Sequence, residues 1–290
     1  MRQLTVIGVG LIGGSLARAL RRAAVVDQIV GCQPDSAGLV RAQQLGVIDR
    51  YATDVASAVA GADLVVLAVP LGALPELFRQ LAVAVPPQAV ITDVGSAKGS
   101  VVSAARQALG ERIASFVPGH PIAGTEHSGV EASFAELFAN HSVMLTPLPE
   151  TAAAALQTVQ QMWRSTGAQL VQTTVEQHDA ALAATSHLPH LLAYTLVDTL
   201  GRIDPTAEIF RYAAGGFRDV SRVASSDPVM WRDICLANRA AIQAVLAAYS
   251  GRLSALQALI EHEDGAGLQQ LFAGAKQLRD RHIVGLKGEE

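Results

Sequence analysis

The 290-residue chain has few cysteines, no excess of basic charge and no long uninterrupted apolar run. Its two cysteines, Cys32 and Cys235, lie far apart and form no metal-binding or redox spacing, so they favour a reducing compartment. The formal net charge of −4 indicates no nucleic-acid or anionic-membrane partner. Charged residues or prolines interrupt every stretch of about 18 residues, the length that a membrane span would need. We therefore expect a cytoplasmic protein.

What the sequence does contain near its start is a glycine-rich stretch, residues 4–20, LTVIGVGLIGGSLARAL. Apolar residues 4–7 predict a buried strand, a G-x-G-x-x-G turn follows, and the spacing after the turn is helical. Gly8 permits the tight bend, Gly10 lets a pyrophosphate approach, and Gly13 lets the helix lie close to the strand. The N-terminus of such a helix suits a diphosphate. We expect dinucleotide contacts from Gly8, Gly10, Leu11, Ile12 and Gly13.

Two alternatives compete for this stretch. One is an ordinary glycine-rich turn, and the strand–turn–helix context argues against it. The other is a secretory signal peptide, which Arg2 and the apolar residues superficially fit. The glycines between Gly8 and Gly14 make a poor apolar helix, and Arg18 and Arg21 fall where the cleaved end should be. We expect no signal peptide.

Strands and helices alternate over the first part of the chain. The sequence predicts strands over residues 29–32, 62–70, 89–93, 113–117, 142–146 and 169–173. Helical spacing lies between them, over residues 35–45, 74–85, 98–109 and 152–163. This alternation predicts an α/β Rossmann-type fold with a doubly wound, mainly parallel sheet. At the end of one strand, Val69 is a further expected cofactor contact.

After about residue 172 the chain shows only helical spacing, over residues 175–200, 229–261 and 266–282. Residues 240–259 are apolar on much of their circumference, which is typical of a helix buried in a helical domain or against a second copy. Half of all residues are hydrophobic, enough for two cores. We expect a Rossmann domain over residues 1–172 and an all-α domain over residues 173–290.

Two polar segments follow predicted strands, at the edge where open α/β sheets bind ligands. In DVGSAKG, residues 93–99, we expect Ser96 to cap the next helix, and its hydroxyl can make a second contact. In GHPIAGTEH, residues 119–127, His120 can act as a general base near pH 7. A lone histidine also fits a structural role, and the residues alone leave both interpretations open.

Two further segments lie in the helical half. His187 and His190 could bind a metal, but no acidic or thiol ligand has suitable spacing and Pro189 disturbs the helix, so we expect no metal site. The segment GGFRDVSRVA, followed by DPVMW, combines arginines, a glycine pair and a tryptophan, which predicts an anion pocket. The alternative is a surface loop whose arginines pair with Asp219 and Asp227.

Together these segments resemble the prephenate/arogenate (cyclohexadienyl) dehydrogenase family of tyrosine biosynthesis. The resemblance covers nearly the whole chain, through VIGVGLIGGSLA, DVGSAKG, HPIAGTEHSGVEAS, SHLPHLLAYTLVDTL and GGFRDVSRVASSDPVMWRDI. It implies oxidative decarboxylation of arogenate, prephenate or both, with hydride transfer to NAD or NADP. It also implies a helical domain that binds substrate and forms a homodimer, with tyrosine as a candidate feedback ligand.

The resemblance implies a role for each matching residue. His120 accepts the proton of the substrate's C4 hydroxyl, and Ser96 hydrogen-bonds near that hydroxyl and the nicotinamide. Arg222 holds a substrate carboxylate. The substrate pocket is lined by Ser186, His187, His190 and Trp231. None of these roles requires a metal ion.

The position that separates NAD from NADP departs from the usual pattern. NAD-binding folds generally place an acid about 20 residues after the glycines, where it binds the ribose. Gln33 stands at that place, and glutamine can bond a 2′-hydroxyl without repelling a 2′-phosphate. Arg41 is the nearest arginine that could bind the phosphate, and Asp35 would oppose it. We expect Gln33 to contact the cofactor, with a slight preference for NAD.

The two substrates differ only in the side chain, where prephenate has a keto oxygen and arogenate an ammonium. An anion near the ammonium favours arogenate, and Glu126 in HPIAGTE can supply one. We therefore expect arogenate to be accepted, alone or alongside prephenate. A solvated loop carboxylate or an acid at the start of a helix is the other interpretation of Glu126.

Two other functions remain as alternatives. A β-hydroxyacid or imine reductase would place a catalytic lysine or aspartate on a helix of the second domain, but Lys276 and Lys287 lie near the end of this chain. A non-catalytic dinucleotide-sensing protein would need the glycine turn but not His120, Ser96 and Arg222 together.

Overall fold

The structure is a computed structural model that describes residues 1–125 and 127–282. Met1–Arg239 forms one compact unit, and a second begins at Ala240. The first unit holds every predicted site residue that the structure describes, and Glu126 lies outside the described residues. This unit therefore contains the geometry that bears on function.

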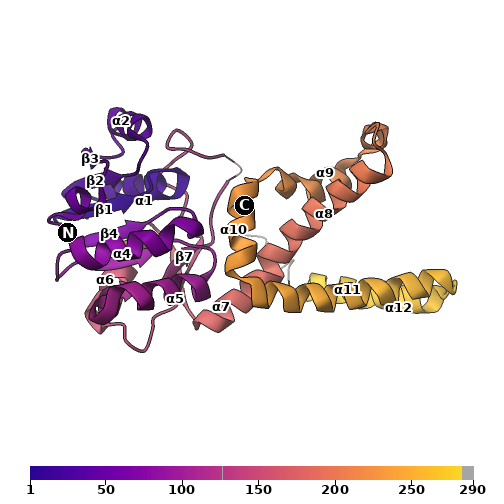
Figure 1. Cartoon of the computed structure of the whole chain (residues 1–290). Coiled ribbons are helices and arrows are strands. Elements are labelled where there is room, and N and C mark those ends of the chain that lie inside the picture. The colour runs from indigo at the N-terminus through magenta and orange to yellow at the C-terminus, as the bar shows by residue number, and fades with distance from the viewer. Residues whose placement is uncertain (126, 283–290) are drawn as a thin grey trace. The chain divides into compact units, whose positions relative to one another are not determined.

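Six parallel strands form the main sheet, in the order β3-β2-β1-β4-β5-β6 (Figure 1). They are β1 (Gln3–Ile7), β2 (Gln28–Cys32), β3 (Arg50–Ala52), β4 (Leu64–Leu67), β5 (Val90–Asp93) and β6 (Phe116–Val117). The order reverses between β1 and β4, which is the point where open α/β sheets bind their ligands. The sequence does not predict β3, because this short strand is only partly buried and has no apolar run.

Helices connect these strands and cover both faces of the sheet (Figure 1). They are α1 (Leu11–Arg22), α2 (Ser36–Gln44), α3 (Val55–Val59), α4 (Leu74–Ala84) and α5 (Lys98–Leu109). In β4, Leu64 and Val66 lie in one apolar cluster whereas Val65 and Leu67 lie in another, because successive side chains of a strand point to opposite faces. The predicted doubly wound, mainly parallel architecture is confirmed.

A second, three-stranded sheet departs from the prediction. It consists of β7 (Gly119–Pro121), β8 (Ser142–Leu145) and β9 (Gln169–Gln172), with β7 antiparallel and β9 parallel to β8; α6 (Ala153–Arg164) precedes β9. The strand predicted over residues 113–117 begins only at Phe116, because Gly110–Ser115 forms a 3₁₀ helix. Pro118 follows that strand and its carbonyl accepts from Thr146 N (3.0 Å), so the chain leaves the main sheet there. His120 consequently lies within a strand, opposite Met144, rather than in a loop.

Beyond β9 the described chain is helical, as predicted. The helices are α7 (Val175–Leu182), α8 (Leu188–Ile203), α9 (Gly215–Ser221), α10 (Pro228–Ala237), α11 (Arg239–Glu261) and α12 (Gly265–His282). One π-helical turn, Ala183–His187, joins α7 to α8, and 3₁₀ turns cover Glu208–Tyr212 and Arg222–Ser225. A further 3₁₀ turn, Leu71–Ala73, precedes α4 in the first part of the chain. Residues 215–225 are therefore helical and not a loop. Among the described residues, no helix has the length and hydropathy needed to cross a membrane.

Candidate functional site

The glycine turn between β1 and α1 has the conformation that its spacing predicts. Gly8 has a φ of +95°, and a Cβ there would lie 2.2 Å from the carbonyl oxygen of Ala68. A Cβ at Gly13 would lie 2.1 Å from the carbonyl oxygen of Gly8, so only glycine allows α1 to approach the turn this closely. At Gly10, in contrast, a Cβ would meet nothing within 4 Å, and the space beside the backbone is open.

The N-terminus of α1 fits an anionic group. Gly10 is its N-cap, no side chain among the described residues caps it, and the first turn carries no acidic residue. Leu11 and Ile12 begin the helix and contact the apolar core. Val69 lies beside the turn, because its Cγ1 would be 2.9 Å from a Cβ on Gly8. Uncapped amides at a positive helix end, next to open space, are suited to a diphosphate.

Gln33 and Asp35 follow the end of β2, and the hydrogen bonds of both side chains are defined. Gln33 Oε1 accepts from Val9 N (3.1 Å), and its Nε2 donates to the Asp35 carbonyl oxygen (3.3 Å). The Asp35 carboxylate caps α2 by accepting from the amides of residues 37 and 38, both at 3.0 Å. Arg41 pairs with Glu131, Nε to Oε1 at 3.2 Å. The negative charge of Asp35 thus occupies the helix end, and the nearest cation predicted for a 2′-phosphate is bound to another carboxylate.

The central feature of the site is a hydrogen-bonded series of three side chains. His120 on β7 contacts His178 on α7, Nδ1 to Nε2 at 2.9 Å, and His178 Nδ1 lies 2.8 Å from Asp179 Oδ1. A carboxylate only accepts, so His178 Nδ1 donates to it. With both rings neutral, His178 Nε2 must then accept from His120 Nδ1. His120 Nε2 is left with a lone pair, the state that a general base needs.

Burial and neighbouring charge keep His120 neutral. Burial lowers its pKa well below the ordinary histidine value, and the Lys98 ammonium and the neighbouring imidazoles of His178 and His187 lower it further. For Asp179, burial raises the pKa, but hydrogen bonds from His178 and from the backbone amides of Lys98 and Gly99 outweigh this and lower it overall. At neutral pH the series therefore has a neutral ring at one end and a carboxylate at the other.

Neither His178 nor Asp179 was predicted as a site residue. They follow one another in the ordinary helical segment VEQHDAAL, where no spacing distinguishes them from surface residues. His178 has 0% of its surface exposed, and only its burial beside β7 reveals its role. A signal of this kind comes from the tertiary structure and not from the local sequence.

The start of α5 corrects another prediction. Ser96 does not cap this helix: the N-cap is Ala97, which makes no side-chain cap bond. The Asp179 carboxylate does so instead, accepting from Lys98 N (2.7 Å) and Gly99 N (2.8 Å). A carboxylate from α7 replaces the local hydroxyl because it satisfies two orphan amides and favours the positive helix end. Ser96 is half-buried and its hydroxyl is not used for this cap.

Residues of the helical half gather around Trp231. The His190 ring stacks on it with centroids 4.0 Å apart, and the His187 ring approaches edge-on at 6.0 Å. Burial lowers the pKa of His190, its bond to the Ser186 carbonyl (2.9 Å) opposes this, and the charge of Arg222 adds to the lowering. Arg222 therefore lies close enough to His190 to influence its charge. The structure brings together five residues that the sequence predicts for one pocket: Ser186, His187, His190, Arg222 and Trp231.

Two buried N–H groups in this cluster have no partner among the described residues. Asn238 Nδ2 donates to His187 Nδ1 (3.2 Å) and to the Asp179 carbonyl oxygen (2.8 Å). Burial lowers the pKa of His187 to about 4, so at neutral pH the ring is neutral and its proton sits on Nε2. His187 Nε2 and Trp231 Nε1 are both buried and unpartnered. Unsatisfied buried donors cost free energy, so a hydrogen-bond acceptor placed beside them would stabilise this cluster.

The arginine segment is largely exposed, as its alternative interpretation expects, but among the described residues the ion pairs of that interpretation are not formed. Within residues 1–125 and 127–282, neither Arg218 nor Arg222 forms an ion pair with Asp219 or Asp227. Asp227 instead caps α10 by accepting from Met230 N (2.7 Å). Arg222 is exposed at the start of a 3₁₀ turn, and its guanidinium is available to an anion.

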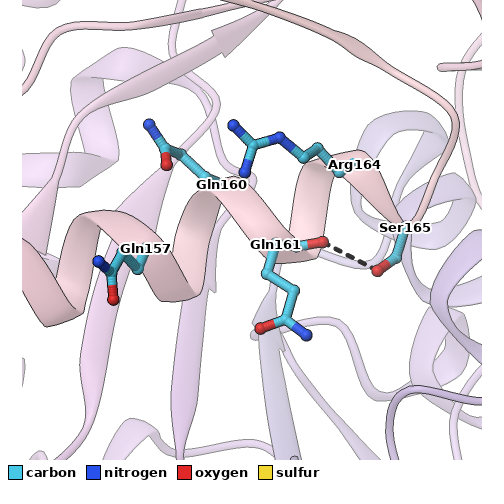
Figure 2. A pocket seen from close by; sticks show the side chains of 5 residues that line it. All are labelled: Gln157, Gln160, Gln161, Arg164 and Ser165. Carbon is cyan, nitrogen blue, oxygen red and sulfur yellow. Dashed lines mark hydrogen bonds between the residues drawn. The ribbon is translucent and has the colours of Figure 1, made fainter.

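Two other features carry no comparable chemistry. The part of the chain that the structure describes holds no cluster of three or more metal-ligating side chains. A hollow on α6 is lined by Gln157, Gln160, Gln161, Arg164 and Ser165. Figure 2 shows that these side chains splay around one helix, and the bond drawn between them joins the Ser165 hydroxyl to the Gln161 carbonyl (2.8 Å). No residue of the glycine turn or of the histidine series lines this hollow.

Comparison with known proteins covers both halves of the chain. Residues 16–172 match the family model for the prephenate dehydrogenase nucleotide-binding domain, and residues 174–274 match the model for its dimerization domain. The chain is 38% identical to the cyclohexadienyl dehydrogenase of Zymomonas mobilis, over 96% of this chain and 95% of the relative. It is 37% identical to the prephenate dehydrogenase of Bacillus subtilis, over 97% and 76% respectively. The structure of prephenate dehydrogenase from A. aeolicus in complex with hydroxyphenyl propionate and NAD+ aligns with a TM-score of 0.91 and 36% identity, over 97% of this chain and 98% of that one.

Proposed function

The chain belongs to the prephenate dehydrogenase family, and from that premise we propose how its residues carry out the reaction. The reaction is oxidative decarboxylation of prephenate, arogenate or both, with hydride transfer to NAD(P). The C4 carbon loses a hydride, the C4 hydroxyl loses its proton, and the ring carboxylate leaves as carbon dioxide while the ring becomes aromatic. When bound, the nicotinamide supplies the hydride acceptor. Neither the reductase nor the cofactor-sensing alternative is favoured.

His120 is the proposed base, and the single observation that carries this is its bond to the His178–Asp179 pair. The series directs the lone pair of His120 to Nε2, which then accepts the C4 hydroxyl proton. The imidazolium that results is stabilised through His178 by the Asp179 carboxylate. His178 and Asp179 act through His120 and are positioning residues.

The cluster around Trp231 is the proposed substrate pocket. Arg222 offers a bidentate guanidinium to a substrate carboxylate. The unpartnered N–H groups of His187 and Trp231 supply donors for substrate oxygens. His190, stacked on Trp231, and Ser186, whose carbonyl accepts from His190, complete the lining. Burial keeps both histidines neutral, so the positive charge of this pocket comes from Arg222.

The glycine turn is the proposed cofactor site, with NAD as the preferred cofactor. Gly8, Gly10, Leu11, Ile12 and Gly13 would hold the diphosphate, with Val69 beside the turn, and the Ser96 hydroxyl would contact the nicotinamide end. Gln33 would bond the ribose. Asp35 at the α2 N-terminus repels a 2′-phosphate, and Arg41 is paired with Glu131. Both observations support NAD over NADP.

Arogenate is the proposed substrate, alone or alongside prephenate, and this proposal rests on the sequence around Glu126. An anion there favours the ammonium of arogenate. We expect Glu126→Gln to weaken the use of arogenate by about 1–2 kcal/mol and to leave prephenate unaffected or improved. An equal effect on kcat/KM for both substrates would remove Glu126 as the discriminating residue.

We propose two domains for this chain and a homodimer formed by the second. A Rossmann domain covers residues 1–172 and a helical domain residues 173–290, a boundary supported by the point where the two family models meet. The helical domain forms a homodimer, supported by its match to a dimerization domain and by exposed apolar side chains such as Ile203 and Leu236, each 68% exposed. The protein is cytoplasmic, and tyrosine is a candidate feedback ligand of the substrate pocket.

The decisive assay incubates the purified protein with prephenate or arogenate and with NAD or NADP, and follows the absorbance of the reduced nicotinamide. We expect turnover of arogenate with NAD, at higher kcat/KM than with NADP. Turnover of prephenate alone would refute the substrate proposal, and a strong preference for NADP would refute the cofactor proposal. Added tyrosine, tested against both substrates, shows whether it competes at the pocket.

A further inference from the structure

A buried ion pair lies next to His120. Lys98 Nζ bonds to Asp93 Oδ2, and both side chains have 0% of their surface exposed. Lysine is almost never fully buried, and removing two charges from water costs more free energy than a simple packing role would justify. Because burying both charges costs free energy, we looked for a role of the Lys98–Asp93 pair in positioning the neighbouring His120.

The ion pair holds both polar backbone groups of Gly119, the residue before His120. Lys98 Nζ donates to the Gly119 carbonyl oxygen (2.6 Å), and Gly119 N donates to Asp93 Oδ1 (3.2 Å). Asp93 is itself fixed by Gly95 N, which donates to Oδ2 (2.8 Å). The strand β7 is only three residues long, so contacts to its first residue largely determine where the His120 ring lies.

The same turn of α5 also supports the ring of His120. Lys98 N and Gly99 N donate to the Asp179 carboxylate, which accepts from His178, which in turn contacts His120. Lys98 therefore reaches His120 by two routes: its side chain holds the backbone, and its amide holds the far end of the histidine series. No other described residue takes part in both.

We propose that the Lys98–Asp93 pair is a positioning device for His120, which holds β7 at Gly119 so that the ring meets His178. The proposal rests on the role of His120 as the base. Lys98 is not a catalytic residue here, because its ammonium is fully enclosed and both of the bonds it makes are to Asp93 and Gly119.

The charge of Lys98 provides a readout that a packing role would not share. Besides burial, three neighbouring groups lower the pKa of His120: the ammonium of Lys98 on α5 and the imidazoles of His178 on α7 and His187 on the π-helical turn. Replacing Lys98 by a neutral residue removes the repulsion by its ammonium and leaves the Asp93 carboxylate uncompensated. Both changes favour the protonated ring, so the pKa of His120 should rise.

The test compares Lys98→Met with the wild type in the full-length protein. We expect kcat to fall by roughly 10-fold to 100-fold with little change in KM, as for a misplaced reacting group. The acid limb of the pH–rate profile, and the side-chain NMR titration of His120 in histidine-labelled protein, should move to higher pH. Lys276→Met is the matched control, since that lysine is 76% exposed and pairs with Asp280 on the surface.

A second variant keeps the proposal falsifiable if the uncompensated Asp93 prevents folding. Asp93→Asn combined with Lys98→Met retains an acceptor oxygen for one of the two backbone amides, and it removes both charges and the bond to the Gly119 carbonyl. A folded variant of either kind with wild-type kcat and an unmoved His120 titration would overturn the proposal. The NMR titration requires no turnover, so its result stands even if His120→Asn shows that another residue is the base.

Discussion

The first half of the compact unit and the helices that follow it differ in how many of their residues are buried. All five residues of β1 are buried, and the largest enclosed side chains, including Trp163 and Phe78, belong to the first 172 residues. In α8, only Ala193 of 16 residues is buried, and α9 has no buried residue. Residues 175–238 bury only eight side chains, and three of these are polar: His178, His187 and Asn238.

The first half therefore contributes mainly to stability, and the helical residues contribute mainly to the candidate site. The apolar half resembles the interior of any α/β domain, where burial of Leu, Val and Phe drives folding. The helical residues contribute the buried imidazoles and amides, which cost free energy unless they are paired and which make the site. Their exposed apolar side chains are the surface that the proposed homodimer would cover.

The largest effect is expected where the two halves meet, at His120. His120→Asn removes the base and keeps a polar side chain, and turnover should fall on the order of 10²-fold or more, with cofactor affinity nearly intact. His141→Asn, a partly buried histidine bonded to the Ala139 carbonyl, is the control. In the wild type the lowered pKa of His120 should keep kcat/KM constant to below pH 6.5. Near-normal turnover in the variant would show that another group takes the proton.

The next effect belongs to the helical half alone. Arg222→Gln should raise KM for the substrate by about 30-fold to 150-fold. This factor corresponds to the loss of roughly 2–3 kcal/mol of charge-assisted hydrogen bonding. The cofactor KM should not change. Arg218→Gln, in the same segment, serves as the control and should behave like the wild type. Unchanged steady-state constants for Arg222→Gln would place the anion site elsewhere.

Asp179 joins the halves, so Asp179→Asn should affect both activity and stability. We expect kcat to fall about tenfold, because the imidazolium at His120 loses its distant carboxylate. The free energy of unfolding should fall by about 1–2 kcal/mol, because the α5 cap weakens. Asp54→Ala, which removes the exposed cap of α3, should lose stability without losing kcat.

The pH dependence of Asp179 follows from its lowered pKa. Because the folded-state pKa lies below the unfolded value, the stabilisation is fully present above about pH 4 and is lost as the pH falls through the folded pKa. The difference in melting temperature between wild type and Asp179→Asn should therefore shrink below about pH 4. A constant difference down to pH 3 would mean that the cap does not depend on the charge.

The smallest effect is expected inside the apolar half, at the cofactor end. Asp35→Ser keeps a capping oxygen at α2 but removes the charge facing a 2′-phosphate. We expect NADP affinity to improve a few-fold, worth roughly 1 kcal/mol, with NAD affinity unchanged. Affinities are measured by fluorescence titration of the free enzyme with each nucleotide. Equal changes for both nucleotides would show that Asp35 does not discriminate between them.

The sequence anticipates structure best where the pattern is local. The glycine turn, the helices over residues 74–85 and 98–109, and the family all follow from patterns a few residues long. The prediction fails at Ser96, because the carboxylate of Asp179, 81 positions after Lys98, caps the helix in its place. It also fails at β7, because a three-residue strand has too few side chains to show a period. Glu126 lies outside the described residues, so its predicted role stays a prediction.

By itself, the sequence determined an apolar α/β half with a glycine turn, a helical remainder and the family to which they belong. It did so because hydrophobic periodicity and backbone conformation are properties of neighbouring residues. Only the tertiary structure decided which groups surround His120. His178 lies 58 positions away, and neither it nor the Lys98–Asp93 pair belongs to a pattern with His120. A buried polar group is stabilised by a hydrogen-bond partner that lies close in space. That partner can come from any position in the sequence, so only the fold decides which groups form the network.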